Sequence, residues 1–177
     1  MKKIYLILTH SGSVPSRIIK TFTRYGYSHV ALALDENLDK MYTFGRKKLN
    51  NAFNGGFIIE TIESEFYHKF KNTHCLVYSL ETSDRNYLRL QAAVEQFVLN
   101  SERYHYDIIG LIFKSINVKI SRKNYFVCTD FISYLLKTSD VHTFNKKVIK
   151  PRDFMAIPHK ELIYNGLLSE YKKSFIL

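Results

Sequence analysis

The order of the apolar segments along the chain constrains its fold more than any other feature. Short apolar runs of strand length dominate the first half, and helical periodicity appears mainly in the second half. Residues 28–34 alternate as a strand does, with Val30 and Leu32 on one side and His29 on the other, beside two alanines. Strands in the first half followed by helices and scattered strands predict an α+β fold.

The remaining elements follow from local patterns. We expect further strands at residues 4–8, 41–46, 57–62, 74–80 and 163–168, and helices at 15–22, 83–100, 106–116 and 129–137. The polar residues 35–40 predict a hairpin loop whose return strand, Met41 to Arg46, pairs with residues 28–34. Residues 50–56 are expected to form a loop with a Gly-Gly turn.

The length and composition predict a single globular domain over residues 1–177. The chain holds 13 tyrosines and 13 phenylalanines but only 7 glycines and 3 prolines, which excludes disordered and collagen-like classes. A domain of this length buries about 70% of the surface that its unfolded chain exposes, so it needs no disulfide or metal to fold.

The charge balance favours anionic partners. Lys and Arg together number 26 against 16 Asp and Glu, a formal net charge of +10, but the basic clusters are short. The excess charge suits an anionic surface as a partner or, as the alternative, serves only solubility, and no specific nucleic acid is expected. The apolar run at residues 4–8 is too short for a signal peptide and no run is long enough for a membrane span, so a cytoplasmic protein is expected.

Cys128 is the sharpest candidate for chemistry. It stands where the extended segment YFV gives way to the helix at residues 129–137. A thiol at a helix N-terminus faces the positive end of the helix dipole and free amide groups, which favour the thiolate. The alternative is a buried structural cysteine, and the segment alone leaves both open. Cys75 lies within a strand-like run with no helix start beside it, so a core position is expected for it.

A thiol nucleophile needs a base, and His29 is the most distinctive of the seven histidines. It lies near the start of the alternating strand in YSHVALAL, on a face that otherwise carries only small alanines, where a helix N-terminus fits. A histidine satisfied within the core is the alternative. No H-x-E pattern or pair of C-x-x-C motifs occurs, so neither a metal nor a cofactor is expected.

Taken together, YSHVALAL, the returning strand MYTFGRK, the segment YDIIGLI and the late cysteine segment YFVCTDFISYLL resemble one family. The chain is similar, from about residue 4 to 170, to the circularly permuted branch of the NlpC-type papain-like cysteine peptidases and amidases. That branch also holds the lecithin:retinol acyltransferase-like proteins, and in it the histidine precedes the cysteine, as here. The resemblance implies a permuted papain-like domain in which an antiparallel sheet packs against the cysteine helix.

The resemblance also implies roles for individual residues. Cys128 is the expected nucleophile and His29 the expected base. A third polar residue, which orients the histidine, is expected on the strand paired with it, where Thr43 is the first candidate and Tyr42 the second. Tyr42 and Tyr27 are also expected near the substrate, with Tyr27 close to the oxyanion.

The expected function is hydrolysis of an amide bond through a thioester on Cys128. The substrate class is a small peptide, an amino-acid amide or an acyl compound. Two alternatives stay open: a lipid acyltransferase or thioesterase on the same fold, and a binding module for an acidic partner that has no catalytic role. The sequence leaves the oligomeric state open.

Overall fold

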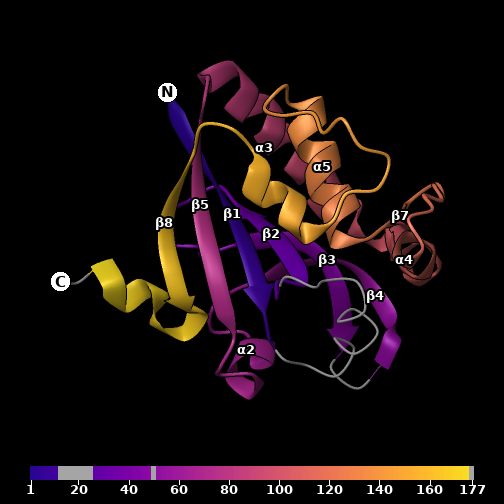
Figure 1. Cartoon of the computed structure of the whole chain (residues 1–177), viewed down its shortest axis with the longest axis horizontal. Helices are drawn as coiled ribbons and strands as arrows, with labels where there is room; N and C mark the ends of the chain where they lie inside the picture. The colour runs from indigo at the N-terminus through magenta and orange to yellow at the C-terminus, as the bar shows by residue number, and fades with distance from the viewer. Residues whose placement is uncertain (12–25, 49–50, 176–177) are drawn as a thin grey trace.

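A computed structural model describes residues 1–11, 26–48 and 51–175, and it confirms the mixed α+β class. The described residues form an eight-stranded sheet in the order β7-β6-β4-β3-β2-β1-β5-β8 (Figure 1). Neighbouring strands are antiparallel except for the parallel pair β6 and β7. The strands are β1 (Lys2–His10), β2 (His29–Ala33), β3 (Met41–Lys48), β4 (Asn51–Glu60), β5 (His74–Thr82), β6 (His105–Tyr106), β7 (Tyr125–Phe126) and β8 (Lys160–Leu167).

The described helices are α2 (Glu65–Lys69), α3 (Asp84–Leu99), α4 (Ile108–Ser115) and α5 (Cys128–Thr138), with 3₁₀ segments at 101–103, 151–156 and 168–175. The helix expected at residues 15–22 lies outside the described residues. Ser83 caps α3, because its side chain accepts a hydrogen bond from the Asn86 amide.

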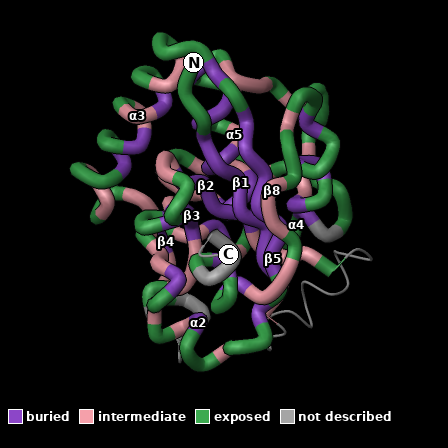
Figure 2. Tube along the Cα trace, turned by 90° about the vertical axis from the view of Figure 1, so that its left-hand side faces the viewer, coloured by how far each residue is buried: buried purple, intermediate pink, exposed green. Residues whose placement is uncertain are grey.

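The sheet has an apolar cluster on each face. Alternate residues of the central strands divide between the two clusters, with Val30 and Leu32 on one face and Ala31 on the other. The first cluster lies under α3 and α5, and the second lies under α2 and the C-terminal 3₁₀ segment. Figure 2 shows the resulting buried centre, in which β1, β2 and β5 run through the middle of the molecule. This two-sided burial explains why these strands are almost continuously apolar.

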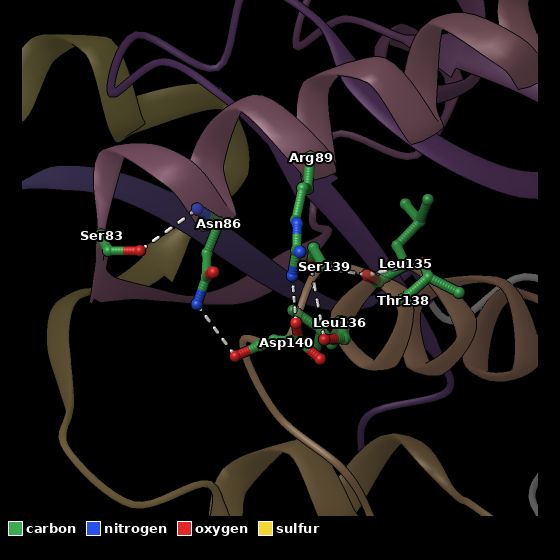
Figure 3. A network of polar contacts seen from close by, with 8 residues as sticks. All are labelled: Ser83, Asn86, Arg89, Leu135, Leu136, Thr138, Ser139 and Asp140. Atoms are coloured by element: carbon green, nitrogen blue, oxygen red, sulfur yellow. Dashed lines mark hydrogen bonds and ion pairs between the residues drawn. The ribbon is translucent and has the colours of Figure 1, made fainter.

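α3 and α5 lie against each other on the first face of the sheet. A polar network joins the start of α3 to the end of α5 (Figure 3). Asn86 donates to the Asp140 carbonyl oxygen at 3.0 Å, and Arg89 forms an ion pair with the Asp140 carboxylate. These contacts hold the C-terminal end of α5 beside α3. The rest of the helix packs against β2 and β3.

The loop expected at residues 50–56 is wrong, because β4 runs continuously from Asn51 to Glu60. Its two glycines lie in a strand because neighbouring chain segments approach closely there. A Cβ atom on Gly56 would lie 2.7 Å from the Tyr104 carbonyl oxygen, and one on Gly55 would lie 2.7 Å from the Tyr106 Cβ. Glycine inside a strand therefore marks close approach here and not a turn.

Candidate active site

Cys128 is the first residue of α5, directly after the short strand β7. The helix forms because Phe131, Ile132 and Leu135 fall on one face, which is buried against the sheet. Its first backbone hydrogen bonds come from the Asp130 and Phe131 amides, which donate to the Val127 carbonyl. The amides of residues 128 and 129 precede these bonds, and Val127 has no side chain that could cap them. The thiol therefore lies at the positive end of the helix, next to amides that make no backbone hydrogen bond among the described residues.

β2 and β3 separate next to the thiol. Their pairing covers Leu32 with Tyr42 and Ala33 with Met41, and among the described residues it does not continue back to Val30. The Val30 carbonyl instead accepts a hydrogen bond from the Thr43 hydroxyl at 2.8 Å. The Val30 main chain also hydrogen-bonds to the Cys128 sulfur. The N-terminus of α5 thus meets the start of β2, where β2 is not paired with β3.

His29, the first residue of β2, lies between Cys128 and an acidic side chain. Its imidazole lies close enough to the Cys128 thiol for the two groups to shift each other's pKa values. On its other side, Nε2 is 3.4 Å from Oε2 of Glu60, the last residue of β4. Only 22% of the His29 side chain and 13% of the Glu60 side chain are exposed. The three residues come from β2, β4 and α5 and form a Cys-His-Glu arrangement.

A tyrosine fixes the position of the glutamate. Tyr67 of α2 is buried, and its hydroxyl donates to Glu60 Oε2 at 2.8 Å. Burial and then the Glu60 charge raise the pKa of Tyr67 well above its usual value, so the phenol keeps its proton and remains a donor. The carboxylate oxygen nearest to His29 Nε2 is therefore also held by α2, on the second face of the sheet.

The surroundings of His29 favour its charged form. Burial lowers its pKa, but the Glu60 carboxylate and the hydrogen bonds to Cys128 and Glu60 outweigh burial and raise the pKa to about 10. For Cys128, burial raises the pKa, but the hydrogen bond and charge of His29, the Val30 hydrogen bond and the Lys114 charge together bring it below the usual value. Both shifts favour a thiolate paired with an imidazolium near neutral pH.

Three further site residues were expected from the sequence: Thr43, Tyr42 and Tyr27. Thr43 shares a face with His29, as expected, but its hydroxyl donates to the Val30 carbonyl, and the group next to the imidazole is Glu60. Tyr42 pairs with Leu32 and stacks on Phe57, which puts it on the opposite face of the sheet from His29.

Tyr27 is half-buried against the first apolar cluster, just before β2. Burial is the main cause of its raised pKa, followed by Cys75 and Tyr78 of β5.

Sequence reasoning missed Glu60 because it searched only the strand expected to pair with His29. The carboxylate comes from β4, one strand further along the sheet. The available signal was a single charged residue ending the apolar segment FII of residues 57–59. Such a residue in a strand next to the core usually has a buried partner.

A narrow pocket of about 40 Å³ borders the thiol. Its lining is mostly apolar and includes Cys128, Tyr106 and Leu111, together with the buried Lys114. Burial, and then the nearby Cys128, raise the pKa of Tyr106, so its phenol is a neutral donor beside the thiol. Sequence reasoning assigned no role to Tyr106 or Lys114.

Comparisons with known protein families, with curated proteins and with solved structures find no match for this chain. In the part of the chain that the structure describes, no cluster of three or more His, Cys, Asp or Glu residues could hold a metal ion. No described helix is long and apolar enough to cross a membrane. The interpretation of the site therefore rests on its own geometry.

Proposed function

We propose that the protein is a cysteine hydrolase that cleaves an amide bond through a thioester on Cys128. The observation that carries the proposal is the position of the His29 imidazole between the Cys128 thiol and the Glu60 carboxylate, at the N-terminus of α5. A nucleophile, a base and a group that orients the base are the parts that thiol-based acyl transfer requires. We further propose that the fold is the permuted papain-like one that the sequence resembles.

In the proposed first half-reaction, the Cys128 thiolate attacks the carbonyl carbon of the substrate. The carbonyl π electrons move to oxygen, and the amides of residues 128 and 129 stabilise that oxyanion. When the carbonyl re-forms, the C–N bond breaks, and the leaving amine takes the proton of the His29 imidazolium. The products are a free amine and a thioester on Cys128.

In the second half-reaction, water adds to the thioester carbonyl while neutral His29 takes the proton from that water. Collapse of this intermediate breaks the C–S bond, which releases a carboxylic acid and restores the thiolate and the imidazolium. Glu60 keeps its charge throughout and acts by stabilising the imidazolium. An acceptor alcohol or amine in place of water would make the same site an acyltransferase.

The test is to trap the thioester. The protein is mixed with an activated aryl ester of a short fatty acid, quenched in acid and digested, and mass spectrometry locates the acyl group. We expect acylation at Cys128, none in Cys128→Ala, and full acylation in the matched variant Cys75→Ala. A protein that remains unacylated, or that is acylated equally in Cys128→Ala, would support the non-catalytic binding module instead.

The sequence-based expectations about the partners and the cytoplasmic location stay predictions. The amide class of the substrate is part of the same proposal. A lipid-directed acyl transfer is the second candidate, and the exposed apolar residues of α4, next to the pocket, favour it.

A further inference from the structure

α4 presents its apolar side chains to solvent. Four of its apolar residues are exposed: Ile109 (49%), Ile112 (55%), Phe113 (37%) and Ile116 (67%), the last of these at the C-cap. They follow the spacing i, i+3, i+4, i+7 and therefore lie on one side of the helix, which we call the α4 face. Figure 1 shows α4 at the periphery of the molecule, beside β7 and far from β8.

The orientation of α4 is fixed by buried polar contacts. Lys114 is 5% exposed, and its Nζ donates to Thr129 Oγ1 at 2.9 Å and to Asp130 Oδ1 at 2.7 Å. At the other end of the helix, Asp107 is buried, accepts from the Gly110 amide at 2.8 Å and forms an ion pair with Arg122. With its lysine bonded inward to α5, the helix cannot turn its isoleucines towards the core without losing these bonds.

A basic pocket adjoins the α4 face. It has a volume of about 340 Å³ and is lined by Asn117, just after α4, and by Lys146, Lys147, Val148, Lys150, Arg152 and Asp153. Four of these lining residues are basic and one, Asp153, is acidic, so the lining carries a formal net charge of +3. Lys146 pairs with Asp153 at 2.5 Å. A pocket of this charge suits phosphate or carboxylate groups.

Both features border the pocket at Cys128. Leu111 and Lys114 of α4 line that pocket, and Lys150 lines both it and the basic pocket. The α4 face, the basic pocket and the thiol are thus neighbours in one part of the molecule. An apolar helix face next to clustered positive charge is the combination that holds peripheral proteins at anionic membranes, because insertion and electrostatic attraction act together.

We propose that the α4 face and the basic pocket form a docking surface for an anionic lipid bilayer. The isoleucines and Phe113 enter the boundary between headgroups and acyl chains, and the basic pocket binds the phosphate of an anionic lipid. Docking holds the Cys128 pocket at the bilayer surface. The part of this inference that concerns substrate rests on the proposed function, because it makes membrane-held acyl compounds the molecules that reach Cys128.

The test is co-sedimentation of the full chain with vesicles of phosphatidylcholine alone or with 30% phosphatidylglycerol, a composition on the order of that of anionic membranes. We expect binding to the anionic vesicles and little binding to the neutral ones. The double variant Ile109→Ser/Ile116→Ser should weaken binding by about tenfold or more, since it removes apolar side chains from the α4 face. The matched control is Leu88→Ser/Leu99→Ser, which changes two exposed leucines of α3.

Two charge variants test whether vesicle binding depends on the basic pocket or on the net charge of the protein. Lys147→Gln/Lys150→Gln should weaken binding to the anionic vesicles by about tenfold. Lys69→Gln/Lys71→Gln removes the same charge from exposed residues at and just after α2. It should change binding by less than about twofold, because charges more than a Debye length from the bilayer are largely screened by salt. Equal losses in the two variants would show that overall charge alone attracts the protein, which would overturn the proposal.

Two further results would also overturn it. One is the absence of binding to anionic vesicles. The other is a dimer that Ile109→Ser/Ile116→Ser dissociates in sedimentation equilibrium, because a second copy would then cover the α4 face. Vesicle binding needs no catalysis, so Cys128→Ala should bind normally. Failure of docking and failure of the proposed function are therefore distinguishable.

Discussion

Cys75 and Cys128 are both buried thiols, yet their surroundings shift their pKa values in opposite directions. Cys75 is 0% exposed in the middle of β5, and burial raises its pKa to about 12. Cys128 is 7% exposed, and burial acts on it in the same direction, but its pKa is lowered. The difference comes from the partners of Cys128: His29, the Val30 main chain and Lys114 all favour the thiolate. Burial without partners disfavours the thiolate, whereas burial beside such partners favours it.

The largest expected effect on the acylation rate comes from removing His29, the residue next to Cys128 that Cys75 lacks. His29→Ala takes away both the hydrogen bond and the positive charge next to Cys128. Acylation by the aryl ester, measured by stopped-flow release of the phenol, should fall by roughly 10²–10⁴-fold.

The matched control for His29→Ala is His68→Ala. His68 also faces a glutamate, at 3.7 Å from Glu63, but this pair is exposed on the surface. His68→Ala should leave acylation unchanged. Equal losses in the two variants would show that the imidazole of His29 has no special role.

The thiols themselves can be compared in one sample. At pH 7, iodoacetamide should modify Cys128 on the order of 10²- to 10³-fold faster than Cys75, because its larger thiolate fraction outweighs the weaker nucleophilicity of a low-pKa thiolate. Labelling of Cys128 should stay fast as the pH falls below about 8.5, the pKa of a free thiol. Peptide mass spectrometry over time measures both rates. Faster labelling of Cys75 would show that Cys128 is not the more reactive thiol.

Glu60→Gln keeps the shape of the orienting side chain and removes its charge. The imidazolium loses its main stabilising partner, so the pKa of His29 falls from about 10 and the thiolate of Cys128 becomes less favoured. The alkaline limb of the acylation profile should move to lower pH by the number of units that the pKa loses, and on that limb the rate should fall by about tenfold for each unit. Glu63→Gln is the control, and an unshifted alkaline limb in Glu60→Gln would exclude Glu60 as the orienting residue.

The smallest effect on reactivity is expected from Thr43→Val. This change leaves the buried Val30 carbonyl without its hydroxyl donor, which should cost about 1–3 kcal/mol of the free energy of unfolding, measured by urea denaturation. Labelling of Cys128 should change less than tenfold, because the Glu60–His29 pair is intact. A loss of reactivity as large as that of Glu60→Gln, in a folded protein, would give Thr43 a direct role in the site.

Local sequence was sufficient to predict several parts of the molecule. The apolar alternation of residues 28–34 identified a strand with His29 on its less bulky face, and the amphipathic pattern after residue 128 identified a helix that begins at a thiol. Both depend on side-chain periodicity within a few residues, which is a local property. The loop expected at residues 50–56 failed because the same glycines that form turns also permit close strand approach, and only the position of β6 distinguishes the two.

The rest of the site was decided by tertiary structure. Which carboxylate lies next to His29 depends on where β2 and β3 separate and on how β4 and α2 close over the second face of the sheet. The exposure of the α4 isoleucines likewise depends on Lys114, whose hydrogen bonds to α5 fix the side of α4 that faces inward. These arrangements come from contacts between segments far apart in the chain, whose energies no local pattern contains. The sequence therefore determined the strand with its histidine and the helix with its cysteine, whereas the folded chain supplied the glutamate and the direction in which α4 faces.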